Sequence, residues 1–243
     1  MKIINATWER RNFGMDAFEI SVEKKDLKDH DEIFRRINEQ NFKNAYVLIK
    51  IPVGDIKLVH ALEDAGFRFL ETQFTLTSHF TPRAEDLEMA EMIDSVATVT
   101  ETILKDKDEW EKIIQKITVG MFDTDRVSLD PALGLDVSCK RYQNWCRDLF
   151  NNPNSVMHVT KLNDDIIGFG IDILNETTGN YEGVLGGMFE NAKNGVYGAN
   201  WITQPFVKMK TSVSSNNLPV LRIHQFCGRI VSKERYVLRK IYD

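Results

Sequence analysis

The residues with the clearest chemical use lie just after a predicted buried strand. The apolar run 183–189 is bounded by turn signals, which predicts such a strand, and residues 200–209 predict a helix. The loop between them contains a lysine and two glycines: Lys193, Gly195 and Gly198. Glycines let the backbone approach a ligand, and the first N–H groups of a helix lack internal partners, so this arrangement can hold phosphate oxygens. A glycine turn without a ligand is the alternative.

The elements around this loop alternate between strands and helices, which predicts an α/β fold class with a mixed sheet. Further strands are predicted at residues 17–23, 45–51, 67–77, 95–103, 156–162, 166–174, 210–214 and 230–240. Further helices are predicted from Asp29 or Asp31 to Gln40, from Asp55 to Ala65, at 108–120, at 136–150, and from Asn216 or Asn217 to Gly228.

Two observations suggest a chain of two parts. The polar run at 81–91 predicts a linker, which places the domain boundary between residues 1–88 and 89–243. The segment 58–77 can also be laid on 220–240, because each reads as a helix, a glycine and a long strand. We therefore interpret the two parts as related units.

Composition excludes several classes of protein. The 243 residues are 42% hydrophobic and 28% charged, which is typical of a soluble globular protein. The net charge of −5 argues against a nucleic-acid binder, and five histidines and three cysteines show no spacing typical of a metal site. We expect no signal peptide, no membrane partner and a cytoplasmic location. The sequence leaves the oligomeric state open, a homodimer included.

The order of elements in residues 95–243 resembles the GNAT N-acyltransferase superfamily. Three segments carry this resemblance: IIGFGIDIL (166–174) as its third strand, NAKNGVYGANW (191–201) as its pyrophosphate loop, and N-x-x-V-L-R-I-H-x-x-x-G (217–228) as its terminal helix signature. A narrower resemblance rests on ATWERRNFGMDAFEI, FDTDRVSLDP, RYQNW and SSNNLPVLRIHQFCGRIVS, which are similar to sugar-nucleotide acetyltransferases of the dTDP-fucosamine type. It implies a GNAT acyltransferase fold preceded by a truncated GNAT-like N-terminal half.

The resemblance implies an acetyl-CoA-dependent N-acetyltransferase that acts on a primary amine of a small molecule, by direct attack in a ternary complex. Its narrower form implies a nucleotide-linked amino sugar as the acceptor. An amino acid, a polyamine or a peptide amine is the alternative acceptor, and the acidic net charge suits such a cation. A non-catalytic binding module with a degenerate GNAT fold is the alternative outside enzymes.

The resemblance places coenzyme A on the glycine loop. Lys193 stands where the family has Gln or Arg, and Val196 and Gly198 stand at its two glycine positions. A backbone N–H near the end of the preceding strand would polarise the thioester carbonyl. The residues expected at the cofactor are Met188, Phe189, Lys193, Asn194, Gly195, Val196, Tyr197, Gly198, Ala199 and Asn217.

Two residues are expected to move protons. His224 replaces the family's late tyrosine, and an imidazole can be protonated near neutral pH and pass a proton to a departing thiolate. A packed or surface histidine is the alternative. Glu190 could take the amine's proton, and a solvated loop charge is the alternative. Tyr197 and Tyr236 are the substitute proton donors.

The acceptor pocket is expected near a charged loop and the helix after it. By resemblance, Asp125, Arg126 and Tyr142 bind the substrate there. Arg126 could hold a diphosphate, because a guanidinium pairs with phosphate oxygens bidentately. Its alternative role is an ion pair with a neighbouring acid, and the alternative for Tyr142 is the hydrophobic core.

Overall fold

The structure, a computed structural model of the whole chain, describes residues 1–77, 88, 91–92, 99–190, 209–226 and 229–243. The predicted helix 200–209 lies outside these residues except for Met209, and most of the predicted linker 81–91 also lies outside them. Within the described parts, we find no helix whose length and apolar character would let it cross a membrane.

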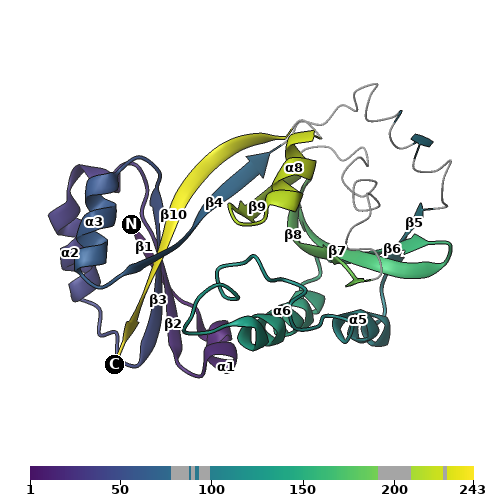
Figure 1. The fold of residues 1–243 in the computed structure, drawn as a ribbon, viewed down its shortest axis with the longest axis horizontal. Helices are drawn as coiled ribbons and strands as arrows, with labels where there is room; N and C mark the ends of the chain where they lie inside the picture. The colour runs from purple at the N-terminus through teal and green to yellow at the C-terminus, as the bar shows by residue number, and fades with distance from the viewer. Residues whose placement is uncertain (78–87, 89–90, 93–98, 191–208, 227–228) are drawn as a thin grey trace.

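The strands of the described residues form one mixed sheet in the order β1-β2-β3-β10-β4-β9-β8-β7-β6-β5 (Figure 1). They are β1 (Lys2–Asn5), β2 (Asp16–Ser21), β3 (Ala45–Pro52), β4 (Arg68–Thr77), β5 (Val99–Leu104), β6 (Ser155–Leu162), β7 (Asp165–Asn175), β8 (Asn180–Met188), β9 (Met209–Ser214) and β10 (Ile230–Tyr242). The predicted α/β class with a mixed sheet is confirmed.

The helices lie on both faces of this sheet. They are α1 (Arg10–Phe13), α2 (His30–Asn38), α3 (Ile56–Asp64), α5 (Lys107–Ile114), α6 (Leu135–Phe150) and α8 (Leu218–Phe226), with short 3₁₀ helices η1 (Thr7–Glu9) and η2 (Asp26–Lys28). In Figure 1, α2 and α3 lie together at one end, whereas α1, α6 and α5 follow one another along the other side of the sheet.

The last strand joins the two parts of the chain. β10 lies between β3 and β4 and pairs antiparallel with both, so that Val237 stands opposite Lys50 on one side and Glu71 on the other. β4 in turn pairs with β9. One continuous sheet therefore spans the proposed boundary, and the division at residue 88 stays a prediction.

Alternation along β3 places hydrophobic side chains in two separate cores. Val47 and Ile49 pack in the cluster that includes Leu58 and Leu62 of α3. Tyr46 and Leu48 face the opposite side and pack with residues of α1, of β10 and of the loop before α6. A third cluster, built from α5, α6 and strands β6 to β8, forms the core of the C-terminal part.

Local signals identified the capped helices and the hairpin correctly. Asp29 and Asp55 cap α2 and α3, since each side chain accepts a hydrogen bond from the backbone N–H three residues later, at 3.0 Å. Asn163 and Asp164 have positive φ values of 49° and 73°, as expected for the two-residue turn between β6 and β7.

Other elements differ from the prediction. The sequence analysis missed β1 and the short helices of residues 7–13, which are too brief to show a clear periodicity. The helix predicted at 108–120 ends at Ile114, and two successive i→i+3 hydrogen bonds follow it, from Lys116 to Ile113 and from Ile117 to Ile114. Ile117 stays buried in the core after the helix has ended, which explains the longer apolar pattern.

Candidate active site

The parallel strands β8 and β9 separate soon after they begin. They pair only at the three positions Tyr181–Gly183 of β8, which stand opposite Met209–Thr211 of β9. The Thr211 hydroxyl donates to the Gly183 carbonyl at 2.9 Å at the last of these positions. Beyond it, β8 continues along β7 to Met188, whereas β9 continues along β4 to Ser214. One edge of β8 is thus left without a strand partner among the described residues.

Met188 and Phe189, the two residues expected to polarise a carbonyl, differ in the hydrogen bonding of their N–H groups. The Phe189 N–H donates to the Ile167 carbonyl of β7 at 2.7 Å, so it is already engaged. Phe189 was therefore wrong as the N–H donor. Because successive N–H groups of a strand point to opposite sides, the Met188 N–H points away from β7, toward the edge that β9 has left. The expectation for Met188 stays a prediction.

The end of β8 is packed closely against its neighbours. A side chain at Gly187 would come within 2.9 Å of Met121 and 3.2 Å of Phe122, and one at Gly168 would come within 2.6 Å of the Met188 sulfur. A side chain at either position would force the neighbouring methionine side chain to shift, because it approaches the backbone so closely. The loop that begins at Met121 thus lies directly against the end of β8.

The structure contradicts the protonated state expected for His224. The side chain is only 3% exposed, and its Nδ1 lies 2.7 Å from a guanidinium nitrogen of Arg229. A guanidinium can only donate, so Nδ1 accepts and the ring carries its proton on Nε2. Burial, together with the charge of Arg229, lowers the pKa of His224 to about 3. His224 is therefore neutral at pH 7 and holds no second ring proton to give to a thiolate. The expectation failed because the sequence pattern does not reveal the burial of this side chain.

The remaining predicted cofactor and catalytic residues have different surroundings. Asn217 caps α8, since its side-chain oxygen accepts from the Val220 N–H at 3.3 Å, and its role at the cofactor stays a prediction. Glu190 is exposed just after β8, and its role as a base also stays a prediction. Tyr236 of β10 packs beside Phe69 of β4. Seven predicted residues lie outside the described part: Lys193, Asn194, Gly195, Val196, Tyr197, Gly198 and Ala199.

The structure brings the three predicted acceptor residues together, in different roles. The Asp125 carboxylate accepts from the N–H groups of Val127 and Ser128 at 3.0 and 2.6 Å, so it fixes the turn of its own loop. Tyr142 stacks on Phe122 with ring centroids 4.0 Å apart. Burial and the nearby Asp125 carboxylate raise the pKa of Tyr142 above its usual value. Tyr142 belongs to the hydrophobic core, as its alternative interpretation expected.

Asp130 fastens this loop to the sheet. Its fully buried carboxylate accepts from Nε and Nη2 of Arg239 on β10 at 2.9 and 3.0 Å, and from the Tyr46 hydroxyl of β3 at 2.8 Å. Burial raises the pKa of Asp130, but these donors and the Ala132 N–H outweigh burial and lower it overall. The loop that carries Arg126 is thus fixed at its far end by a buried ion pair.

Arg126 lies in a group of buried and half-buried charges on the sheet face that this loop covers. Its nearest carboxylate oxygen is Oε1 of Glu71 on β4, at 3.7 Å, and Lys50 of β3 pairs with Glu19 of β2 at 3.0 Å. Burial lowers the pKa of Arg126, but the carboxylates of Glu71, Glu19 and Asp125 outweigh it, so the pKa is raised. Arg126 therefore stays charged at every pH at which the protein is folded.

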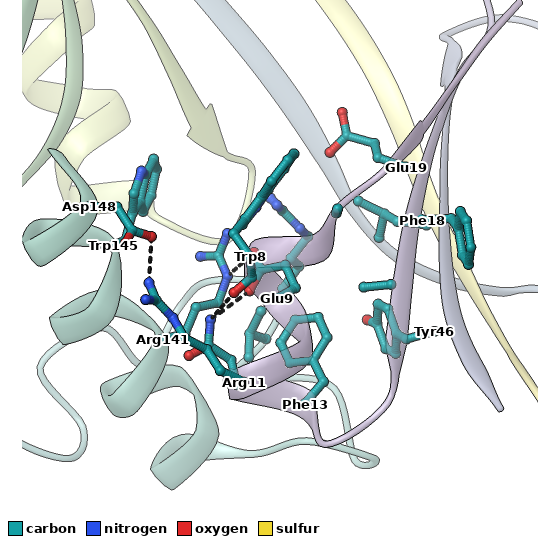
Figure 2. A pocket seen from close by; sticks show the side chains of 16 residues that line it. Trp8, Glu9, Arg11, Phe13, Phe18, Glu19, Tyr46, Arg141, Trp145 and Asp148 are labelled. Carbon is teal, nitrogen blue, oxygen red and sulfur yellow. Dashed lines mark hydrogen bonds and ion pairs between the residues drawn. The ribbon is translucent and has the colours of Figure 1, made fainter. Parts of the chain in front are cut away.

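A cavity of about 300 Å³ opens between the N-terminal segment and α6 (Figure 2). Arg126 and Glu19 line it, together with the aromatic side chains of Trp8 and Trp145. Its other charged side chains are engaged with one another, as the dashed lines of Figure 2 show. Arg141 donates to Glu9 at 2.7 Å, Asn12 donates to the same carboxylate at 2.9 Å, and Arg11 pairs with Asp148.

Sequence reasoning found Arg126 but missed most of this cavity. The run TWERRN at 7–12 places a tryptophan, an acid, two arginines and an asparagine within six residues, and it lines the cavity on one side. Such a cluster is a usable signal for a site. Glu71 was missed because it lies within an alternating strand pattern whose charged positions are normally solvent-exposed.

No protein-family model matches the sequence, and no curated protein sequence matches it either. Solved structures do match the fold. A GCN5-related N-acetyltransferase from Sphaerobacter thermophilus is 11% identical with a TM-score of 0.55, over 99% of this chain and 75% of the other. A functionally unknown conserved protein from Staphylococcus epidermidis is 9% identical with a TM-score of 0.57, over 94% and 85%.

Likeness at such low identity establishes the fold alone. Neither structure bears on the narrower resemblance to the dTDP-fucosamine type. The large mixed sheet agrees with this likeness. The chain has the fold of the GCN5-related N-acetyltransferases.

Proposed function

We propose that this protein is an acetyl-CoA-dependent N-acetyltransferase that acts on a primary amine of a small molecule. The observation that carries the proposal is the edge of β8 beyond Gly183, where β9 has turned away toward β4. It leaves the Met188 N–H directed to a side that has no strand partner among the described residues, beside a loop that leads to a cavity. A backbone N–H held in a rigid strand costs no reorganisation when it receives a developing negative charge.

The residues at this edge fit a thioester ligand. When bound, acetyl-CoA supplies an activated acetyl group for direct attack by the amine in a ternary complex. The Met188 N–H would donate to the carbonyl oxygen, and the exposed carboxylate of Glu190, two residues later, is the proposed acceptor of the amine's proton. The glycine loop at 191–198 is the proposed pyrophosphate site, on the sequence pattern alone.

The proposed acceptor is a nucleotide-linked amino sugar, as the narrower resemblance implies, with an amino acid, a polyamine or a peptide amine as the alternative. One observation favours a second function. His224 is neutral and buried, so the described residues lack the cationic proton donor that we expected. A non-catalytic binding module with a degenerate GNAT fold is consistent with that loss.

Calorimetric titration with acetyl-CoA tests the cofactor. We expect binding by the wild type, and loss of binding in the double variant Lys193→Ala, Gly198→Glu. Lys210→Ala is the matched control, because Lys210 is an exposed lysine on β9 whose nearest carboxylate oxygen, on Glu182, is 4.0 Å away. Absence of binding by the wild type would contradict the proposal.

Transfer is tested with a panel of amines and acetyl-CoA, in the wild type and in Met188→Pro. Proline removes the N–H that points away from β7, so it leaves the ladder between β8 and β7 unbroken. Loss of one such donor costs roughly 10²–10³ in kcat. Met188→Leu keeps the N–H and should keep kcat. Acetyl-CoA binding without turnover of any amine would favour the non-catalytic alternative.

A further inference from the structure

Arg126 differs from the other two arginines that line the cavity. Arg11 pairs with Asp148, and Arg141 donates to Glu9 at 2.7 Å, whereas Arg126 makes no hydrogen bond to any described residue. Its closest acceptor, Glu71 Oε1, is 3.7 Å away, which is too far for a hydrogen bond. The Arg126 side chain is only 21% exposed, so water reaches little of it. A half-buried guanidinium whose donors have no hydrogen-bond partner among the described residues favours an anionic ligand.

The pair of Arg126 and Glu71 is open, in the sense that no hydrogen bond joins the two side chains. The Glu71 side chain is 2% exposed, and its Oε2 has no hydrogen-bond partner among the described residues. A closed structural pair between Arg and a carboxylate has two parallel hydrogen bonds at about 2.7–2.9 Å, which would satisfy both carboxylate oxygens. Here neither bond is formed. The Glu71 carboxylate favours the charged form of Arg126. The N–H donors of Arg126 remain available to a ligand in the cavity that Arg126 lines.

The cavity is suited to a small molecule with a flat face. Its volume of about 300 Å³ matches the lower end of small-molecule sites. Trp8 and Trp145 line it, and Trp8 is 53% exposed although it is a large aromatic side chain. An aromatic face of this kind packs against a ring, whether of a sugar or of an aromatic group.

The loop between Phe122 and Arg126 connects this cavity with the end of β8. Phe122 lies against Gly187, and Arg126 enters the cavity four residues later. Asp125 and Asp130 hold the loop in this course, through its own turn and through the ion pair with Arg239. The cavity and the end of β8 are therefore contacted by opposite ends of the same five-residue segment, Phe122 to Arg126.

We propose that this cavity binds the acceptor, and that the acceptor is an amine that also carries a carboxylate or a phosphate, which Arg126 holds through its guanidinium. The proposal rests on the proposed function, since it names the substrate class of that reaction. It also gives the N-terminal part a direct role, because residues 6–19 form one side of the site.

The fluorescence of Trp8 and Trp145 supplies the assay, measured without acetyl-CoA. Two matched pairs of probes differ in the anion alone: glucosamine 6-phosphate with glucosamine, and L-phenylalanine with phenethylamine. We expect the wild type to bind the anionic member of at least one pair more tightly. The pair that shows this difference tells whether the anion is a phosphate or a carboxylate.

Arg126→Gln should weaken binding of that anionic probe roughly 10- to 100-fold, which corresponds to the loss of charge-assisted hydrogen bonds, and should leave its neutral counterpart unchanged. Arg126→Lys keeps the charge but loses the planar pair of N–H donors, and it should lose part of the affinity for the anionic probe. Arg35→Gln is the control, because Arg35 is an exposed arginine on α2 that is paired with Glu32 and does not line the cavity, and it should have little effect. Thermal melts of each variant establish that it is folded.

The proposal is overturned if no probe binds the wild type at millimolar concentration, or if Arg126→Gln and Arg35→Gln weaken binding equally. Calorimetry with acetyl-CoA on the same preparation tests the proposed function separately. Probe binding that depends on Arg126, in a protein that binds no acetyl-CoA, would support the site and contradict the enzyme. Acetyl-CoA binding without any anion preference would do the reverse.

Discussion

Replacement of Asp130 by asparagine tests whether the ion pair beneath the cavity holds its loop. The variant keeps the size of the side chain but removes the charge that faces Arg239 and Tyr46. Asp130 is 0% exposed, and the Arg239 side chain is 17% exposed. After the change, the NH₂ group of the new amide would face groups that also donate, such as the Arg239 guanidinium or the Tyr46 hydroxyl. The Arg239 guanidinium would also lose its only close carboxylate among the described residues.

The expected cost follows from burial. Loss of one partner of a buried pair costs about 3–5 kcal/mol, and we expect about 3 kcal/mol here because Arg239 recovers some hydration. For a chain of this size, such a loss lowers Tm by about 6–12 °C. Glu111→Gln is the control, since the Glu111–Arg147 pair is 36% and 42% exposed and should contribute below about 1 kcal/mol.

Urea unfolding followed by circular dichroism measures both variants. The lowered pKa of Asp130 adds a pH dependence: its contribution is present above the ordinary carboxyl pKa of about 3.9 and is lost as pH falls through the lower folded value. The difference between wild type and Asp130→Asn should therefore shrink in acid. A cost at pH 7 no larger than that of Glu111→Gln would refute the argument.

Three further predictions concern other parts of the molecule. His224 has a pKa of about 3 in the folded protein and near 6.5 in the unfolded chain. Its contribution to stability is therefore present above pH 6.5 and falls by about 1.5–2 kcal/mol as the pH drops from about 6.5 to about 5. His224→Gln should remove this loss of stability, as measured by urea titrations. Gly168→Ala should destabilise the protein by about 1–3 kcal/mol in the same assay and slow acetyl transfer, because the new methyl group would lie 2.6 Å from the Met188 sulfur. Cys146 is 0% exposed and burial raises its pKa to about 12, so a maleimide should modify it far more slowly than Cys139, as measured by peptide mass spectrometry.

Each of these predictions has a matched control. For His224→Gln, the control is the exposed Thr178→Ala, which removes no titratable group and should leave the pH dependence of stability unchanged. For Gly168→Ala, the exposed Thr178→Ala in the loop between β7 and β8 should change neither stability nor transfer. Labelling in urea should make Cys146 as reactive as Cys139, and fast labelling of the folded protein at Cys146 would contradict its burial.

Local chemistry made part of the fold predictable. Asp29, Asp55 and the Asn163–Asp164 turn were readable because a cap or a tight turn depends on residues within a few positions of one another. The resemblance added the GNAT acyltransferase fold, and the structural neighbours agree with it. It gave the place of β8 but could not tell Met188 from Phe189, because that choice depends on a hydrogen bond to Ile167 of another strand.

The rest depended on contacts between distant segments. The low pKa of His224 arises from burial and from Arg229, and neither follows from the residue type. The open pair of Arg126 and Glu71 joins residues 55 positions apart, on a loop and on a strand that the sequence analysis had assigned to different domains. The insertion of β10 between β3 and β4 pairs segments that lie far apart in the sequence. Hydrophobic alternation identifies a strand but does not tell which other strand it pairs with.

That insertion also has a consequence for synthesis of the protein. The ribosome makes β3 and β4 long before β10, and until residues 230–242 emerge, the edges of both strands lack the partner that they have in the finished sheet. The N-terminal part must therefore wait for almost the whole chain before it can complete its sheet. Pairings of such long sequence separation slow folding and leave strand edges open to other chains. A nascent chain stalled shortly before residue 230 should therefore bind chaperones, and release of the last strand should end that binding.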